Sequence, residues 1–444
     1  LNSLLSSVAD AGRELLRGDR KWFPGGKAVD GGIEKLCNDL LSSKGEALGT
    51  ALACTFVDVY RGMNNVERQD FFELLLNSFS ASPERIESAI RAYQADQNPS
   101  RLHTLLECSE APRLELFRRV NMAPNGTETL VNLRGQLIPL LKKYPELAEV
   151  DGDLRHLMSS WFNRGFLRLE KIDWHTPAFI LEKLIAYEAV HTMEGWDDLQ
   201  RRLADDRRCF AFFHPAMGDE PLIFVQVALC KGLAGSAQKL LESDIDGGMQ
   251  EQADTAIFYS ISDCQAGLKG ISFGNFLIKQ VVMELQSELP NLQHFATLSP
   301  IPGFCRWLNK QIADKQLTEE QLKHLEKFDD PQHRKTHKIS EAAQAMLMQL
   351  CAHYLYSVKR GELPLDPVAR FHLRNGASIE RINWDGDLSA KGIRQSAGIM
   401  VNYRYNLKRV EERHENFVND HVIAVERDFL KALNFELLSS DNNQ

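Results

Sequence analysis

The amino-acid sequence predicts a helical N-terminal bundle followed by a mixed α/β domain, and three observations support this. Residues 1–157 carry apolar residues at helical spacing, separated by turn residues. Two β-rich runs joined by a Pro/Gly/Asp turn occupy residues 208–229. A third β-rich run, residues 256–261, passes through a glycine-rich turn into a helical pattern at 275–285. We therefore expect a helical domain over 1–157 and a mixed α/β domain over 158–444.

The helices of the first domain are indicated by their caps and their apolar stripes. Ser82 is a suitable N-cap, and Pro83 takes the first position of a helix over 82–94. Segments 111–120 and 130–144 have apolar residues three and four apart, as amphipathic helices do.

The second domain alternates helical and β-rich patterns. The purely helical pattern ends at residues 161–174. Residues 181–191 then have the pattern of a helix. The runs within 208–229 predict a hairpin. Residues 298–308 predict a proline-restricted loop that leads into a short helix, and 316–360 is again helical.

Composition limits the possible functions of the chain. The 444 residues carry a formal net charge of −9, which argues against a general nucleic-acid binder. Eight cysteines are scattered singly, as expected for free thiols in a reducing compartment. The longest apolar run, 221–230, is too short to cross a membrane. No targeting signal is evident, although the first residue is Leu1, so we expect a cytoplasmic protein without a membrane partner.

The turn between the run 256–261 and the following helix has glycines at 267, 270 and 274. Glycines allow backbone amides to approach an anion, and the start of a helix adds positive potential. The spacing matches neither the dinucleotide fingerprint nor the P-loop. Gln265, Gly267 and Gly270 instead resemble the pyrophosphate loop of GCN5-related acetyltransferases, which holds the diphosphate of coenzyme A. A purely structural turn remains the alternative.

Longer motifs make the resemblance specific. The stretches "FYSISDCQAGLKGISFGNFLIKQVVMELQ", "FATLSPIPGF", "VARFHLRNGA", "RINWDGDLS" and "VNYRYNL" together resemble the malonyl-CoA decarboxylase family, in one order and over nearly the whole chain. The resemblance implies a catalytic domain with an acetyltransferase-like fold, conversion of malonyl-CoA to acetyl-CoA and CO2 within fatty acid metabolism, and a homotetramer assembled through the helical domain.

This reaction removes CO2 from a carboxylate β to a thioester. The electrons pass into the thioester carbonyl and form an enolate, which is then protonated on carbon. Because the thioester is its own electron sink, we expect neither an organic cofactor nor a metal; coenzyme A is part of substrate and product. The protein must orient the carboxylate, stabilise the enolate and supply a proton.

The resemblance implies three catalytic residues. Ser299, in "LSPIPGF", would contact the substrate and act in proton transfer, whereas a serine that only caps a turn is the alternative. His372, in "ARFHLRNGA", would donate the proton. Tyr405, in "NYRYNL", is a candidate hydroxyl donor or, alternatively, a core aromatic residue.

The substrate-binding prediction covers the glycine turn. We assign the cradle for the CoA diphosphate to seven consecutive residues, Lys269, Gly270, Ile271, Ser272, Phe273, Gly274 and Asn275. Two other functions remain open at this point: a CoA-dependent acyltransferase, which would require an added acceptor, and a catalytically silent CoA-binding protein.

Overall fold

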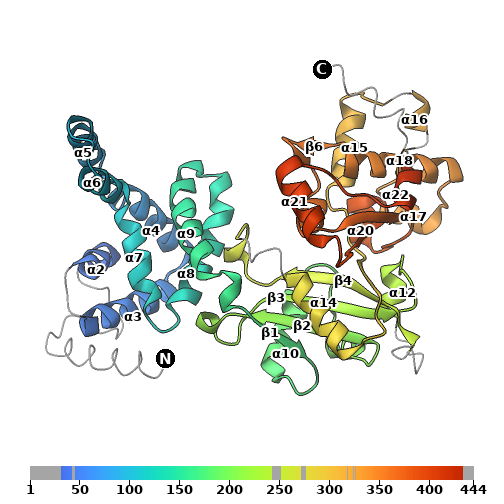
Figure 1. The fold of residues 1–444 in the computed structure, drawn as a ribbon, viewed down its shortest axis with the longest axis horizontal. Helices are drawn as coiled ribbons and strands as arrows, with labels where there is room; N and C mark the ends of the chain where they lie inside the picture. Colours follow the sequence, from blue (N-terminus) through green and yellow to red (C-terminus); the bar gives the residue numbers. More distant parts are fainter. Residues whose placement is uncertain are drawn as a thin grey trace. The chain divides into compact units, whose positions relative to one another are not determined.

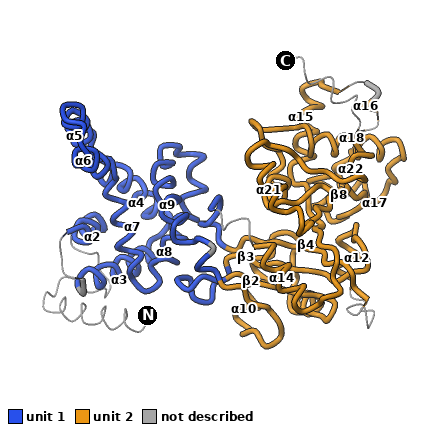
Figure 2. Tube along the Cα trace, viewed as in Figure 1, with its two compact units in different colours: residues 1–167, 213–221, 265–272 blue, residues 168–212, 222–264, 273–444 orange. Residues whose placement is uncertain are grey.

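A computed structural model describes residues 32–42, 46–242, 252–271, 277–317, 319–323, 325 and 327–433. The chain divides into two compact units (Figure 2). Unit 1 consists of residues 1–167 together with two short stretches, 213–221 and 265–272. Unit 2 contains the remainder. The predicted order of a helical region and a mixed α/β region is confirmed, while the boundary at residue 157 stays a prediction.

Unit 1 is built from α-helices (Figure 1). They are α2 (Gly32–Leu41), α3 (Glu46–Gly62), α4 (Asn65–Ser78), α5 (Pro83–Ala95), α6 (Pro99–Ser109), α7 (Pro112–Asn121), α8 (Gly126–Leu137) and α9 (Ala148–Trp161). The short 3-10 turns are η1 (Ile138–Lys142), η2 (Pro145–Leu147), η3 (Arg164–Phe166), η4 (Pro215–Met217) and η5 (Ala266–Leu268).

The sequence signals for these helices hold with one exception. The Ser82 side chain accepts a hydrogen bond from the Arg85 amide at the start of α5, as predicted. The helix expected over 130–144 instead ends at Leu137 and continues as the 3-10 turn η1. Pro139 has no amide hydrogen to continue the α-helical pattern.

The glycine turn packs against helix α8. A Cβ on Gly267 would lie 1.8 Å from the carbonyl oxygen of Val131, so only glycine fits there. The buried Arg134 donates to the carbonyl oxygens of Gly267 at 2.6 Å and Lys269 at 2.9 Å. Its Nε also pairs with Asp151 at 2.8 Å. The turn is therefore a fixed part of unit 1.

Unit 2 contains a seven-stranded sheet in the described part of the chain, in the order β1-β2-β3-β4-β5-β9-β8. The strands are β1 (Arg168–Ile172), β2 (Arg207–Phe213), β3 (Pro221–Cys230), β4 (Thr255–Asp263), β5 (His294–Thr297), β8 (Ser378–Asn383) and β9 (Met400–Arg404). A separate two-stranded sheet pairs β6 (Lys359–Arg360) with β7 (Leu363–Pro364). The two β-rich runs of the predicted hairpin are the neighbouring strands β2 and β3, which confirms their pairing.

The helices of unit 2 surround this sheet (Figure 1). They are α10 (Ala178–Tyr187), α11 (Trp196–Arg202), α12 (Ala237–Leu241), α14 (Leu277–Glu288), α15 (Phe304–Ala313), α16 (Glu319–Lys323), α17 (Pro331–Thr336), α18 (Glu341–Tyr356), α19 (Pro367–Arg374), α20 (Ala390–Ser396), α21 (Val410–Asp420) and α22 (Arg427–Ala432). None of the described helices is both long enough and apolar enough to cross a membrane.

An apolar cluster joins the middle strands of the sheet to α12. Its buried members are Ala228, Ala237, Leu240, Ile257, Tyr259, Ala296, Leu298 and Met400. They come from α12, from β3, β4 and β9, and from β5 with the residue after it, so burial of one core holds four neighbouring strands of the sheet together.

The helix predicted over 181–191 is wrong at its C-terminal end, because α10 stops at Tyr187. The Glu188 carboxylate turns back to accept hydrogen bonds from the amides of Val190 and His191. Such local side-chain bonds offer the backbone an alternative to the helix.

Candidate active site

Ser299 follows strand β5 in a backbone position fixed by β9. Its amide donates to the carbonyl of Val401 at 2.8 Å, and the Val401 amide donates back to the carbonyl of Ser299 at 3.0 Å. Pro300 and Pro302 restrict the chain that leads into α15. The loop predicted from these prolines is therefore present, and its first residue is tied to the sheet.

His372 lies in the helix α19, whose start is defined by a buried acid. The Asp366 carboxylate caps the helix by accepting from the amides of Val368 at 3.0 Å and Ala369 at 2.9 Å. Pro367 occupies the first helical position, as in many helices. This cap fixes the helix that carries the imidazole.

The structure brings the three predicted catalytic side chains together. Ser299 Oγ lies 3.0 Å from His372 Nε2, and His372 Nδ1 lies 2.9 Å from the Tyr405 hydroxyl. Ser299 Oγ donates to Thr297 Oγ1 at 2.8 Å. All four side chains belong to unit 2 and are buried. They form one continuous chain of hydrogen bonds from Tyr405 to Thr297.

The directions of these bonds assign the tautomer of His372. The Ser299 hydroxyl has a single hydrogen, which it donates to Thr297. It must then accept from His372, so the imidazole proton is on Nε2. Nδ1 is left as an acceptor for the Tyr405 hydroxyl.

Burial keeps this imidazole uncharged in the free protein. The pKa of His372 is lowered to about 3 by desolvation, and burial raises the pKa of Tyr405 well above its usual range. The imidazole ring stacks on Tyr403 with centroids 4.5 Å apart. The site therefore holds a neutral imidazole between two hydroxyl groups.

This burial predicts a dependence of stability on pH. Between pH 6.5 and 3 the unfolded chain binds a proton at His372 that the folded chain excludes, so stability falls as the pH decreases. Changing the pH from 7 to 5 should lower the free energy of unfolding of the parent by about 2 kcal/mol more than that of His372→Asn. Urea unfolding followed by circular dichroism would measure this, with His103→Asn as the exposed control. Equal decreases in the parent and His372→Asn would contradict it.

The hydroxyl–imidazole chain lies beside a divergence in the sheet. Strands β4 and β5 are parallel but pair only from Thr255–Phe258 to His294–Thr297. Beyond this point β4 continues to Asp263 and, among the described residues, pairs only with β3, with a register shift at Gln226/Val227. Ligands of open α/β sheets bind outside the carboxyl ends of strands where neighbours separate. Ser299 follows the carboxyl end of β5, which is where such a ligand would be expected.

Comparison with known proteins identifies the family. The model of the malonyl-CoA decarboxylase C-terminal domain matches residues 165–442, and that of the N-terminal domain matches residues 79–162. The chain belongs to the malonyl-CoA decarboxylase family. This confirms the resemblance and the expected enzyme class, a decarboxylase of malonyl-CoA.

Individual relatives agree with this assignment over most of the chain. The crystal structure of malonyl-CoA decarboxylase from Rhodopseudomonas palustris is 44% identical, with a TM-score of 0.87, over 91% of this chain and 100% of that one. The enzyme from Agrobacterium vitis is 46% identical, with a TM-score of 0.84, over 90% and 99%. The mitochondrial malonyl-CoA decarboxylase of Anser anser anser is 38% identical over 80% of this chain and 77% of its own length.

The cradle prediction is described only in part. Lys269, Gly270 and Ile271 belong to unit 1, whereas Ser272, Phe273, Gly274 and Asn275 lie outside the described residues. The amides of Lys269 and Ile271 donate within the turn, to Ala266 and Leu268. Gly270 has φ of +79°, a conformation that favours glycine. Of the described cradle amides, that of Gly270 is the one for which no bond within the turn is recorded.

Sequence reasoning missed four residues that support the site and the turn. They are Arg134, Thr297, Asp366 and Tyr403. Thr297 stands two residues before Ser299 on a strand, so alternation could have placed both side chains on one face. Asp366 before Pro367 is a cap signal that could have marked the start of α19. Among the described residues, no three His, Cys, Asp or Glu side chains gather as a metal site requires.

Proposed function

We propose that this family member decarboxylates malonyl-CoA with Ser299, His372 and Tyr405 as its catalytic residues. The observation that carries the proposal is the buried chain of hydrogen bonds from the Tyr405 hydroxyl through His372 to Ser299, beside the divergence of β4 and β5. A proton on His372 Nε2 can pass along this chain to the Ser299 hydroxyl and from there to one position on the substrate.

The proposed reaction begins with the charge of the substrate. The malonyl carboxylate brings a negative charge that favours protonation of a neighbouring imidazole, so His372 takes up a proton from water as the substrate binds. The bond between the carboxylate carbon and the α-carbon then breaks. CO2 leaves, and the electron pair moves into the thioester carbonyl to give the enolate.

Protonation of the enolate completes the reaction. The Ser299 hydroxyl donates its hydrogen to the enolate carbon and takes the hydrogen of His372 Nε2 in its place. The electron pair of the enolate returns to form the new C–H bond, which gives acetyl-CoA. Tyr405 donates to Nδ1 when the imidazole is neutral and accepts from it when both nitrogens carry hydrogen. One proton from water is consumed in each turnover.

The thioester supplies the electron sink in this scheme, so we propose that the reaction uses no organic cofactor or metal. We also propose that residues 269–275 hold the CoA diphosphate through backbone amides. The positive φ of Gly270 and the anchoring of the turn by Arg134 support this role, because a fixed backbone loses little freedom on binding.

The experiment that tests the function is direct. Purified protein is incubated with malonyl-CoA alone, and acetyl-CoA is measured by liquid chromatography. Decarboxylation predicts product without any added acceptor. Formation of acyl product only in the presence of an amine or thiol would instead identify an acyltransferase, and folded protein without turnover would refute the proposal.

We propose that self-association into a homotetramer uses unit 1. Helices α5 and α6 lie side by side and extend from the other helices of this unit (Figure 1). Ala89 is the one buried residue of α5, and α6 has none. Leu106 is 60% exposed and Leu102 is 42% exposed. An apolar hairpin surface of this kind is suited to a second copy of the chain.

The hairpin surface gives a test of assembly. Leu106→Glu places a charge in the proposed contact and should raise the dissociation constant of the oligomer by about tenfold or more, the effect of burying an unpaired charge. Analytical ultracentrifugation at several concentrations would measure the shift. Thr104→Glu adds the same charge to a different side of α6 and should change little. If Leu106→Glu keeps the parental mass at all concentrations, the hairpin is not the contact.

We further propose a cytoplasmic location and a role in fatty acid metabolism. None of the eight cysteines, all of which lie within the described residues, forms a disulfide bond, which is consistent with a reducing compartment. Fractionation of cells that produce the protein, followed by immunodetection, would test the location.

A further inference from the structure

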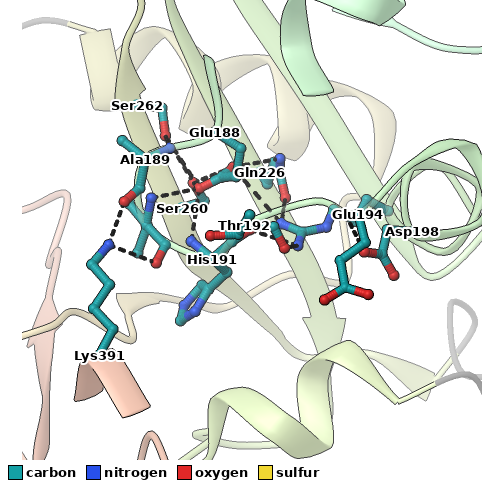
Figure 3. Close-up of polar contacts among 12 residues, drawn as sticks. Glu188, Ala189, His191, Thr192, Glu194, Asp198, Gln226, Ser260, Ser262 and Lys391 are labelled. Carbon is teal, nitrogen blue, oxygen red and sulfur yellow. Dashed lines mark hydrogen bonds and ion pairs between the residues drawn. The ribbon is translucent and has the colours of Figure 1, made fainter. Parts of the chain in front are cut away.

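A buried carboxylate stands where α10 ends, in the segment 188–192 (Figure 3). The Glu188 side chain is fully buried and accepts hydrogen bonds from five described groups. The donors are the amides of Val190 and His191, Gln226 Nε2, and the hydroxyls of Ser260 and Ser262. Arg202, with Nη1 3.7 Å from Oε2, supplies the opposite charge. A buried carboxylate with this many partners holds its surroundings in one arrangement.

Glu188 is attached to the part of β4 that β5 does not pair with. Ser260 and Ser262 both follow Phe258, the last residue of β4 paired with β5. Gln226 stands on β3 at the register shift. The Ala189 amide donates to Ser262 Oγ at 3.3 Å, which adds a second link. The segment 188–192 is therefore fastened to the diverging half of β4.

A lysine from the helix between strands β8 and β9 holds the same segment. Lys391, in α20, donates through Nζ to the carbonyl oxygens of Ala189 and, at 3.2 Å, Val190 (Figure 3). Helix α20 packs against α15, where Cys305 Sγ donates to the carbonyl of Ile393 at 3.7 Å. Helix α15 begins directly after the loop of Ser299. The contacts thus run from β4 through Glu188 and Lys391 to the helix that follows Ser299.

We propose that Glu188 and Lys391 are positioning residues that together fix the divergence of β4 from β5, and with it the binding of the acyl-CoA substrate. Neither residue takes part in breaking the carbon–carbon bond. Their contacts connect β4 to the helix that follows Ser299, on the two sides of the strand separation where the ligand is expected, so they act on substrate affinity more than on the chemical step. The inference rests on the proposed site at Ser299 and His372.

The test separates KM from kcat in the full-length protein. Lys391→Met removes the donor but retains the length of an exposed side chain, and it should raise the KM for malonyl-CoA about tenfold while kcat changes by about twofold or less. Lys391→Arg retains a donor and should restore most of the affinity. Lys310→Met, on the exposed part of α15, is the matched control and should match the parent. Thermal unfolding checks that each variant is folded.

Ser262→Ala removes the hydroxyl on β4 that bonds to Glu188 and Ala189. It should also raise the KM for malonyl-CoA, by a smaller factor than Lys391→Met. Parental KM and kcat in folded Lys391→Met would overturn the proposal. So would a fall in kcat at unchanged KM, since that would place Lys391 in the chemical step. Failure of the site itself is distinguished separately: it would appear as parental kcat in Ser299→Ala or His372→Ala, whatever Lys391→Met does.

Discussion

Replacing His372 with alanine is expected to lower kcat by about 10²- to 10⁴-fold, the range for loss of a group that transfers a proton. In the described structure the imidazole links the two hydroxyls: His372 Nδ1 lies 2.9 Å from the Tyr405 hydroxyl, and His372 Nε2 lies 3.0 Å from Ser299 Oγ. Alanine removes both bonds and leaves Ser299 without its source of a proton. A 10³-fold loss corresponds to about 4 kcal/mol of transition-state stabilisation.

The measurement is steady-state formation of acetyl-CoA, together with the dissociation constant of coenzyme A from calorimetry. The binding of coenzyme A should remain within about threefold of the parent, because coenzyme A lacks the malonyl group on which His372 is proposed to act. His103→Ala changes an exposed histidine of α6 and is the control. A His372→Ala enzyme with a kcat near that of the parent would show that the proton comes from another group.

Replacing Ser299 with alanine is expected to lower kcat by about 10²-fold or more, because the proposed relay then has no hydroxyl between imidazole and carbon. The backbone bonds of residue 299 to Val401 do not depend on the side chain, so the loop should keep its position. Thr297 retains its bond from the Tyr403 amide. The change is therefore confined to the reacting hydroxyl.

Ser396→Ala is the matched control for this variant. Ser396 is also a buried serine, but its hydroxyl bonds only to the carbonyl oxygens of Gly392 and Ile399 in the described structure. The Ser396→Ala variant should be less stable than the parent but should keep the parental kcat. If Ser299→Ala turns over malonyl-CoA at the parental rate, the serine belongs to the structure of the loop, as the turn-capping alternative holds.

Much of the fold could be predicted from local patterns. Ser82 followed by Pro83 marked the start of α5, and the β-rich run 256–261 lies within β4. Patterns failed where a distant partner decides the local conformation. The helical pattern continued past Tyr187, yet Glu188 leaves the helix because its carboxylate accepts hydrogen bonds from the hydroxyls of Ser260 and Ser262 on β4.

The catalytic residues could be named only through family motifs. Composition gives no reason to choose His372 among 13 histidines. Ser299 and His372 are 73 positions apart in the chain, and only the pairing of Ser299 with Val401 and the Asp366 cap of α19 bring their side chains together. Such long-range geometry leaves no periodic trace in the sequence. The electrostatic state of the imidazole likewise depends on burial, which no single motif encodes.

The glycine turn has a practical consequence for how this enzyme can be dissected. Its stretch 265–272 belongs to unit 1, although the strands on either side of it belong to unit 2. A gene fragment that begins at Arg168 would encode the turn while deleting Val131 and Arg134, the residues that hold it. Truncation or exchange of the N-terminal segment would therefore alter a loop that begins 97 positions after the cut at Arg168, so the two parts of the chain cannot be exchanged independently.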